Sequence, residues 1–430
     1  MTQTKTNRRA FLKGATTTAA TLLAARTLFP SGAFAQSAGP EVTGARLGFI
    51  ALTDAAPLII ASEKGIFAKY GMPDVTVEKQ ASWGTTRDNL VLGSAGGGID
   101  GAHILTPMPY LISNGTVTQN SIPTPMYILA RLNLDGQCIS VGQEYTGLAV
   151  GTDATAFKDA LAAKKAGGAP VRAAMTFPGG THDLWIRYWM AAAGIDPDSD
   201  IETIVVPPAQ MVANMKVGSM DCFCVCEPWN EQLKNQQIGY TALTTGELWN
   251  KHPEKAFGMR ADWVDANPIA AKALLMAVME AQMWCEDMAH RKEAAEIVAK
   301  RNWINAPVAD VVDRMQGRFD YGNGKVVESS PHIMSYWANQ ASYPFKSHDL
   351  WFLTENVRWG YLTGDEDFAA LIDKVNREDL WKEAAGELAV AAADIPASTS
   401  RGIETFFDGK VFDPADPAAY LASLSIKRSA

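Results

Sequence analysis

The sequence predicts an α/β protein made of two lobes, each a parallel β-sheet covered by helices. From about Val42, short apolar runs alternate with segments of helical spacing, which is the pattern of parallel sheets packed between helices. A second series of the same kind follows a turn-rich segment at residues 145–151. The chain has 430 residues, which is too long for one ordinary core and fits two domains with additional elements.

The first 35 residues are expected to be a twin-arginine export signal. Arg8 and Arg9 precede Phe11-Leu12-Lys13, a mildly apolar stretch follows at 15–25, and Ala33-Phe34-Ala35 offers an A-x-A cleavage site. This order favours export over the alternative of a disordered basic tail. Because no cysteine lies near the cleavage site, we expect a soluble periplasmic protein that is not a lipoprotein.

Loss of this signal makes the chain more acidic. The signal contains five basic residues and no acidic one, so its removal changes the net charge from −9 to −14. An acidic surface argues against nucleic acids or anionic membranes as partners. No run outside the signal is long enough to cross a membrane.

The first lobe is expected to comprise residues 42–146 and 259–430, and the second lobe residues 147–258. The strands expected in the first lobe are 45–51, 75–79, 101–104, 127–132 and 138–141, and the helices are 56–69, 85–93 and 107–113. The second lobe alternates helices 154–166, 183–193 and 209–217 with strands 171–176, 201–206 and a strand through Cys222, Cys224 and Cys226. Two such units, joined by more than one crossing, leave a cleft between them.

The C-terminal part is expected to be mainly helical. Asn267-Pro268 starts a helix, because asparagine can cap it and proline fits its first turn. Apolar residues then follow helical spacing from Leu274 to Cys285, which predicts a long helix that returns to the first lobe. Residues 394–417 carry few signals and are expected to lie over the surface.

The segment Phe177-Pro-Gly-Gly-Thr-His leads into a helix. Gly179-Gly180 permits a tight turn, and Thr181 or Asp183 can cap the helix. The unpaired N–H groups of a first helical turn suit an anion, and His182 can donate a hydrogen bond there. Taken alone, the segment favours the simpler interpretation, in which Thr181 caps the helix and His182 is solvated.

The remaining motifs argue against an enzyme. Cys222, Cys224 and Cys226 alternate with apolar residues, which indicates a buried strand; the alternative of a metal cluster has no fourth ligand at zinc-like spacing. The glycine-rich segment 92–100 fits neither a P-loop nor a dinucleotide fingerprint, and no HExxH, G-x-S-x-G or Cys-His pair is found. We therefore expect no catalytic residues and no cofactor, with an exported redox enzyme as the least favoured alternative.

Five segments of the chain closely resemble the nitrate- and bicarbonate-binding proteins of ABC importers. They are 175–189 (Met-Thr-Phe-Pro-Gly-Gly-Thr-His onward), 205–218, Glu227-Pro-Trp-Asn, His252-Pro-Glu-Lys-Ala and 346–356 (Lys-Ser-His-Asp-Leu-Trp onward). The similarity runs in order from about Arg46 to Tyr361. It implies a two-lobed, hinged periplasmic-binding-protein fold of type II, an oxyanion in the cleft, a monomer, and a membrane permease and an ATPase as partners.

The resemblance also implies a set of ligand residues. In the nitrate branch a tryptophan, a glutamine, a histidine and a lysine hold the ligand, and these match Trp83, Gln137, His182 and Lys255. Thr181 either caps its helix or joins this site. In the bicarbonate branch the lysine position is acidic and the glutamine is changed, in keeping with a calcium-assisted site. This chain keeps both residues, so nitrate is favoured, with nitrite as a related ligand and no metal.

The chemistry of the four side chains agrees with nitrate. Nitrate cannot donate a proton, so a fitting site offers donors, and all four residues carry N–H groups. Bicarbonate has an O–H group that needs an acceptor. The alternatives that stay open are a bicarbonate or an organic sulfonate receptor, because the fold alone does not select the anion. Taken alone, Lys255 is ambiguous, since a single lysine in a loop is usually solvated.

Overall fold

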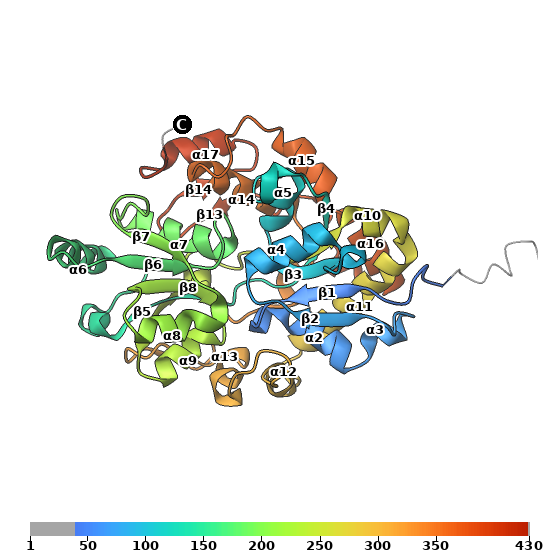
Figure 1. Cartoon of the computed structure of the whole chain (residues 1–430), viewed down its shortest axis with the longest axis horizontal. Coiled ribbons are helices and arrows are strands. Elements are labelled where there is room, and N and C mark those ends of the chain that lie inside the picture. Colours follow the sequence, from blue (N-terminus) through green and yellow to red (C-terminus); the bar gives the residue numbers. More distant parts are fainter. Residues whose placement is uncertain (1–38, 429–430) are drawn as a thin grey trace, which may run out of the picture.

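The computed structural model describes residues 39–428 and places two five-stranded sheets side by side in two lobes (Figure 1). The predicted export signal, residues 1–35, lies outside the described residues. Within residues 39–428, no helix has both the length and the apolar character that a membrane span requires. The predicted α/β class and the two-lobed architecture are confirmed.

The first sheet has the strand order β2-β1-β3-β10-β4. Its strands are β1 (Arg46–Phe49), β2 (Thr76–Lys79), β3 (Gly101–Leu105), β4 (Met126–Arg131) and β10 (Lys255–Arg260). β1 is parallel to β2 and β3, whereas β10 is antiparallel to β3 and β4. The helices of this lobe are α2 (Ala56–Glu63), α3 (Ile66–Lys69), α4 (Trp83–Leu92), α5 (Met108–Ser113), α10 (Ala261–Ala266), α11 (Pro268–Glu286) and α12 (Arg291–Val298).

Two helix predictions in this lobe have different outcomes. The predicted helix over 56–69 is interrupted, because Gly65 has a φ of 69° in the left-handed region and α3 starts after it. The predicted long helix is present as α11, with Pro268 in its first turn. It packs against α2 and α3, so it returns to the first lobe as expected.

The second sheet has the strand order β7-β6-β8-β5-β9. Its strands are β5 (Gln137–Gly142), β6 (Arg172–Met175), β7 (Glu202–Val205), β8 (Cys222–Cys226) and β9 (Gly239–Thr244), and its helices are α6 (Thr155–Ala166), α7 (Thr181–Ala192), α8 (Met211–Lys216) and α9 (Trp229–Asn235). β6 is parallel to β7 and β8, whereas β5 is antiparallel to β8 and β9. Every residue of β8 is buried, as predicted for a strand through the cysteines.

The sheets differ from the prediction in the direction of some strands and in which strands belong to each sheet. Each contains antiparallel strands, so neither is purely parallel. The sequence places β5 in the first lobe, but β5 pairs in the second sheet, and the chain crosses between β4 and β5, ahead of the predicted boundary at 147. The return crossing lies between β9 and β10, ahead of the predicted boundary at 259. Periodicity identifies a strand but not the neighbour with which it pairs.

The C-terminal part packs on both lobes. Its elements are α13 (Val312–Met315), β11 (Phe319–Asp320), β12 (Val326–Val327), α14 (Lys346–Arg358), α15 (Phe368–Val375), α16 (Glu378–Glu387), β13 (Glu404–Thr405), β14 (Val411–Phe412) and α17 (Pro417–Ser423). Residues of α14 and α17 join the hydrophobic core of the second lobe. Phe406 and Phe412 are buried in the same core, so the prediction that residues 394–417 only cover the surface is wrong in part.

A buried arginine ties this C-terminal part to the second lobe. Arg314 of α13 donates to the carboxylates of Glu227 and Glu231 at 2.5 and 2.7 Å and to the Thr241 hydroxyl at 2.8 Å. All of these side chains are buried. Removal of a charge from such a cluster leaves the opposite charges without compensation, which is strongly destabilising.

We therefore expect Arg314→Ala to lower the free energy of unfolding by about 3–5 kcal/mol, as measured by urea denaturation. The matched control is Arg318→Ala, four residues further on. Arg318 also pairs with two acids, but its side chain is 40% exposed and the pairs are screened by solvent, so the expected loss is much smaller than that of Arg314→Ala. Equal losses for the two variants would contradict the importance of the buried cluster.

Candidate functional site

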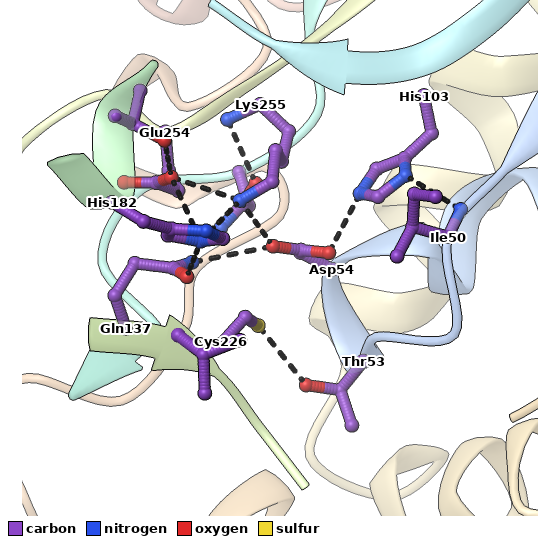
Figure 2. Close-up of polar contacts among 12 residues, drawn as sticks. Ile50, Thr53, Asp54, His103, Gln137, His182, Cys226, Glu254 and Lys255 are labelled. Carbon is purple, nitrogen blue, oxygen red and sulfur yellow. Dashed lines mark hydrogen bonds and ion pairs between the residues drawn. The ribbon is translucent and has the colours of Figure 1, made fainter. Parts of the chain in front are cut away.

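The five residues predicted for the site lie at the beginnings of their elements. Trp83 is the first residue of α4, Gln137 of β5 and Lys255 of β10, while Thr181 and His182 are the first two residues of α7. All five are fully buried. They come from both lobes, and Gln137, His182 and Lys255 meet where the two lobes face each other (Figure 2).

Lys255 lies at the centre of the site, between two carboxylates. Its Nζ is 2.8 Å from Asp54 Oδ2, 2.8 Å from Glu254 Oε1 and 3.3 Å from His182 Nε2. Burial alone would lower the pKa of Lys255, but the two carboxylates outweigh it and raise this pKa above its ordinary value. Lys255 is therefore charged and buried, so of the two interpretations that its segment alone left open, the solvated loop lysine is excluded.

Asp54 accepts hydrogen bonds from three donors. His103 Nε2 lies 2.6 Å from Oδ1, while Lys255 Nζ and Gln137 Nε2 lie 2.8 and 3.2 Å from Oδ2 (Figure 2). Although burial raises it, the pKa of Asp54 is held well below its ordinary value by Lys255 and His103. Burial lowers the pKa of His103, and the Ile50 N–H at 3.5 Å from His103 Nδ1 leaves the ring proton on Nε2.

The orientation of His182 follows from its neighbours. Asp54 can only accept, so the Gln137 amide nitrogen faces Asp54 and its Oε1 faces His182 Nε2 at 2.7 Å. Nε2 therefore carries the proton, and Nδ1 accepts from the Thr176 hydroxyl at 2.6 Å. Burial, together with the Lys255 charge, lowers the pKa of His182 well below its ordinary value, in agreement with a neutral ring.

Thr181 contacts Glu254 and does not cap its helix. The N-cap of α7 is Gly180, and no side chain caps this end. The Thr181 hydroxyl donates to Glu254 Oε1, and the Trp185 indole nitrogen donates to Oε2 at 2.6 Å. Asp183, the other predicted cap, instead accepts from the Gly179 N–H at 2.9 Å. Thr181 thus belongs to the site through Glu254.

The two glycines before α7 permit close packing around the site. A Cβ at Gly179, which has a φ of 71°, would lie 2.4 Å from Asn356 Oδ1, and one at Gly180 would lie 2.6 Å from Leu105. Asn356 of α14 also donates to the Gly179 carbonyl at 3.1 Å. The C-terminal part therefore helps to place the start of the helix that carries Thr181 and His182.

Trp83 supplies a buried donor. Its indole Nε1 has no hydrogen-bond partner among the described residues. The ring lies 5.4 Å from the His103 ring, and Lys255 Nζ is 5.9 Å from the ring centroid. An unpaired buried N–H costs free energy, and such groups are often kept where a ligand can accept from them.

Direct contacts between the lobes surround this cluster. The Thr53 N–H donates to the Glu227 carbonyl at 2.9 Å, and the Trp229 indole donates to the Ala51 carbonyl at 3.0 Å. Thr53 Oγ1 also lies 3.6 Å from Cys226 Sγ. Since Thr53 adjoins Asp54, the segment that holds Asp54 is fixed against the second lobe.

Sequence reasoning missed Asp54, His103 and Glu254. One signal was available for His103, because a histidine inside an apolar strand needs a buried partner. Asp54 follows the first strand and Glu254 precedes Lys255, and nothing in their spacing marks them.

Together the residues of the site place one ammonium, two carboxylates and several N–H donors at one point, an arrangement suited to a small polar ligand with acceptor atoms. No cluster of possible metal ligands occurs within residues 39–428.

The chain was compared with known proteins. The model of the NMT1-like family matches residues 38–299. The chain is 66% identical over 389 residues to the nitrate/nitrite binding protein NrtA of Synechocystis sp., covering 90% of this chain and 86% of that protein. A crystal structure of the periplasmic nitrate-binding protein NrtA from Synechocystis PCC 6803 has a TM-score of 0.88 and 65% identity, covering 90% of this chain and 100% of that chain.

Two further relatives are less similar. The bicarbonate-binding protein CmpA of Synechococcus elongatus is 46% identical, with 90% of this chain and 88% of that protein covered. The nitrate import ATP-binding protein NrtC of Synechocystis sp. is 34% identical, with 91% of this chain but 56% of that protein covered.

The protonation state of His182 can be tested directly. With ¹⁵N-histidine labelling, we expect the six histidine rings to include one with its proton on Nε2 that stays neutral when the pH is lowered through about 6.5, where an exposed histidine becomes charged. The variant His182→Gln should remove this signal and so assign it. A His182 ring that gains its second proton near pH 6.5 would contradict the buried arrangement.

Proposed function

Because this chain belongs to the NMT1-like family and is 66% identical to a nitrate/nitrite binding protein, we propose that it is a receptor that holds nitrate between its two lobes. The observation that carries this proposal is the meeting of Lys255, Gln137 and His182 at one buried point, with the Trp83 ring centroid 5.9 Å from Lys255 Nζ. All four carry N–H groups, and nitrate accepts hydrogen bonds through each of its three oxygens.

Two donors are free to bind the anion first. The ammonium of Lys255 has three N–H bonds, of which two are directed to Asp54 and Glu254, and the remaining neighbour, His182 Nε2 at 3.3 Å, carries its own proton and offers the third no acceptor. The indole N–H of Trp83 has no partner among the described residues. Gln137 and His182 then turn their N–H groups from their present acceptors to the anion. Three or four hydrogen bonds to a charged ligand, at about 1.5–3 kcal/mol each, support micromolar affinity after ordering costs.

The receptor works with a membrane transporter rather than as an enzyme. We propose that it delivers nitrate to the permease and ATPase of an ABC importer, and the similarity to a nitrate import ATP-binding protein supports this assignment. The expected twin-arginine signal and the periplasmic relative support a place in the periplasm. We further propose that the protein acts as a monomer.

Bicarbonate is the second candidate ligand. The carboxylates of Asp54 and Glu254 offer acceptors for its O–H group, and a bicarbonate-binding protein is 46% identical. Nitrate is preferred because both carboxylates already accept three hydrogen bonds each, counting Lys255. This leaves each carboxylate about one of its four acceptor positions for a ligand O–H group.

Isothermal titration calorimetry separates these ligands. We expect nitrate to bind with micromolar affinity, nitrite to bind within the same site, and bicarbonate and sulfate to bind at least about 100-fold more weakly, which corresponds to about 2.7 kcal/mol. Titrations of bicarbonate are repeated with calcium. The absence of binding at millimolar nitrate, or calcium-dependent bicarbonate binding tighter than nitrate binding, would contradict the assignment.

Lys255→Met tests the role of the ammonium with little change in volume. We expect nitrate affinity to fall by at least about 100-fold, because the one charged donor is lost. The free energy of unfolding should also fall by about 3–5 kcal/mol, since two buried carboxylates lose their counter-ion. Lys69→Gln is the control, because it removes an exposed lysine that pairs with Glu280. A Lys255→Met protein that folds and binds nitrate like the control would remove Lys255 from the site.

A further inference from the structure

The site holds more negative than positive charge before any anion enters. Among residues 39–428, Lys255 is the one buried cation in contact with both Asp54 and Glu254, and both carboxylates lie 2.8 Å from its ammonium. The neighbouring rings of His103 and His182 each use Nδ1 as an acceptor, from the Ile50 N–H and the Thr176 hydroxyl, so each ring carries one proton and no charge, and burial lowers the pKa of both. A bound nitrate would bring three negative charges around one ammonium. Burial of an uncompensated charge costs several kcal/mol, so such an arrangement strongly opposes binding.

Resting on the proposed function, we propose that nitrate binding is coupled to the uptake of one proton by Glu254. The carboxylate of Glu254 takes this proton from solvent as the anion binds, and the site then gains no net charge. The protonated Glu254 is also one more O–H group beside Lys255. The proton thus becomes a second ligand of the receptor, bound in the same step as the anion.

The partners of the two carboxylates select Glu254 over Asp54. The three groups at hydrogen-bond distance from Asp54 are donors only: the ammonium of Lys255, the amide nitrogen of Gln137 and the Nε2–H of His103. The thiol of Cys226 also adjoins Asp54, but its sulfur is only a weak acceptor. A proton added to Asp54 would therefore face a donor hydrogen and find no strong acceptor. Glu254 Oε1 instead contacts the hydroxyl of Thr181, which can donate or accept. This hydroxyl can turn and accept from a protonated Glu254.

The other groups around Glu254 do not supply the missing positive charge. From the segment before β10, His252 Nδ1 lies 3.6 Å from Oε2, but this nitrogen donates to the Pro253 carbonyl, and burial lowers the pKa of His252 to about 4. From α7, Trp185 donates to Oε2, and the neutral His182 lies 3.7 Å from Oε1.

Other ionisable groups lie beyond the residues that contact Glu254. On β8, burial keeps the thiol of Cys224 protonated by raising its pKa. Beyond His252 lie Asp135, at 3.8 Å from its Nε2, and the partly exposed Lys251, at 3.4 Å from Asp135. These two form their own pair and leave the charge around Lys255 unchanged. Burial raises the pKa of Glu254 above its ordinary value even beside Lys255, which favours the uptake of a proton when an anion approaches.

Calorimetry in buffers of different ionisation enthalpy tests the coupling, because it counts protons taken up per nitrate bound. In titrations at pH 6, 7, 8 and 9, the number of protons taken up per nitrate should rise with pH toward one. The Kd for nitrate should then increase by up to about tenfold per pH unit at the alkaline end. Infrared difference spectra of the full-length protein should show a protonated carboxyl band on nitrate addition. Nitrate binding without proton uptake at every pH would overturn the coupling and leave the proposed function intact. Absence of nitrate binding would overturn both.

Two variants test the assignment to Glu254. Glu254→Gln keeps the size of the side chain but cannot titrate, so it should bind nitrate with a Kd that is independent of pH, no proton uptake and no carboxyl band. Glu202→Gln removes an exposed carboxylate that pairs with Arg172 in the second lobe, and it should behave like the wild type. Proton uptake that persists in Glu254→Gln would overturn the assignment. If Glu254→Gln does not fold, the infrared band decides: its absence in the wild type contradicts the proposal.

Discussion

The buried ammonium of Lys255 is the interaction on which the rest of the site depends. A lysine without access to water is stable in its charged form only beside compensating charge, and Asp54 and Glu254 supply it at 2.8 Å. Asp54 in turn fixes Gln137 and His103, and Gln137 fixes the proton of His182. One buried charge therefore orients side chains that come from four different segments of the chain.

This network crosses the boundary between the lobes, which connects the site to the arrangement of the whole molecule. Lys255 and Asp54 belong to the first lobe, whereas Gln137 and His182 begin elements of the second. The hydrogen bonds from the Thr53 N–H to the Glu227 carbonyl and from the Trp229 indole to the Ala51 carbonyl lie beside it. The polar contacts to Asp54 and these two hydrogen bonds therefore order the site and join the two lobes at the same place.

Part of the fold and part of the site could be predicted. The alternation of strands and helices, the long helix after Pro268 and the buried strand through the cysteines follow from periodicity and capping, which are local properties. The antiparallel placement of β5 and β10 could not be predicted in this way, because pairing depends on which strand edge is free in the folded sheet. For the same reason, the packing of Phe406 and Phe412 in the second lobe left no local signal.

The sequence by itself determined the class of the fold and, through its resemblance to one family, predicted four ligand residues, Trp83, Gln137, His182 and Lys255. It did not reveal that Lys255 is buried, that Thr181 contacts Glu254 and leaves its helix without a side-chain cap, or that Asp54 joins the donors of both lobes. Those features were decided by the tertiary structure. Hydrogen bonds and burial depend on distances between segments such as 54 and 137 or 182 and 255, and only the folded lobes bring these segments within 3–4 Å.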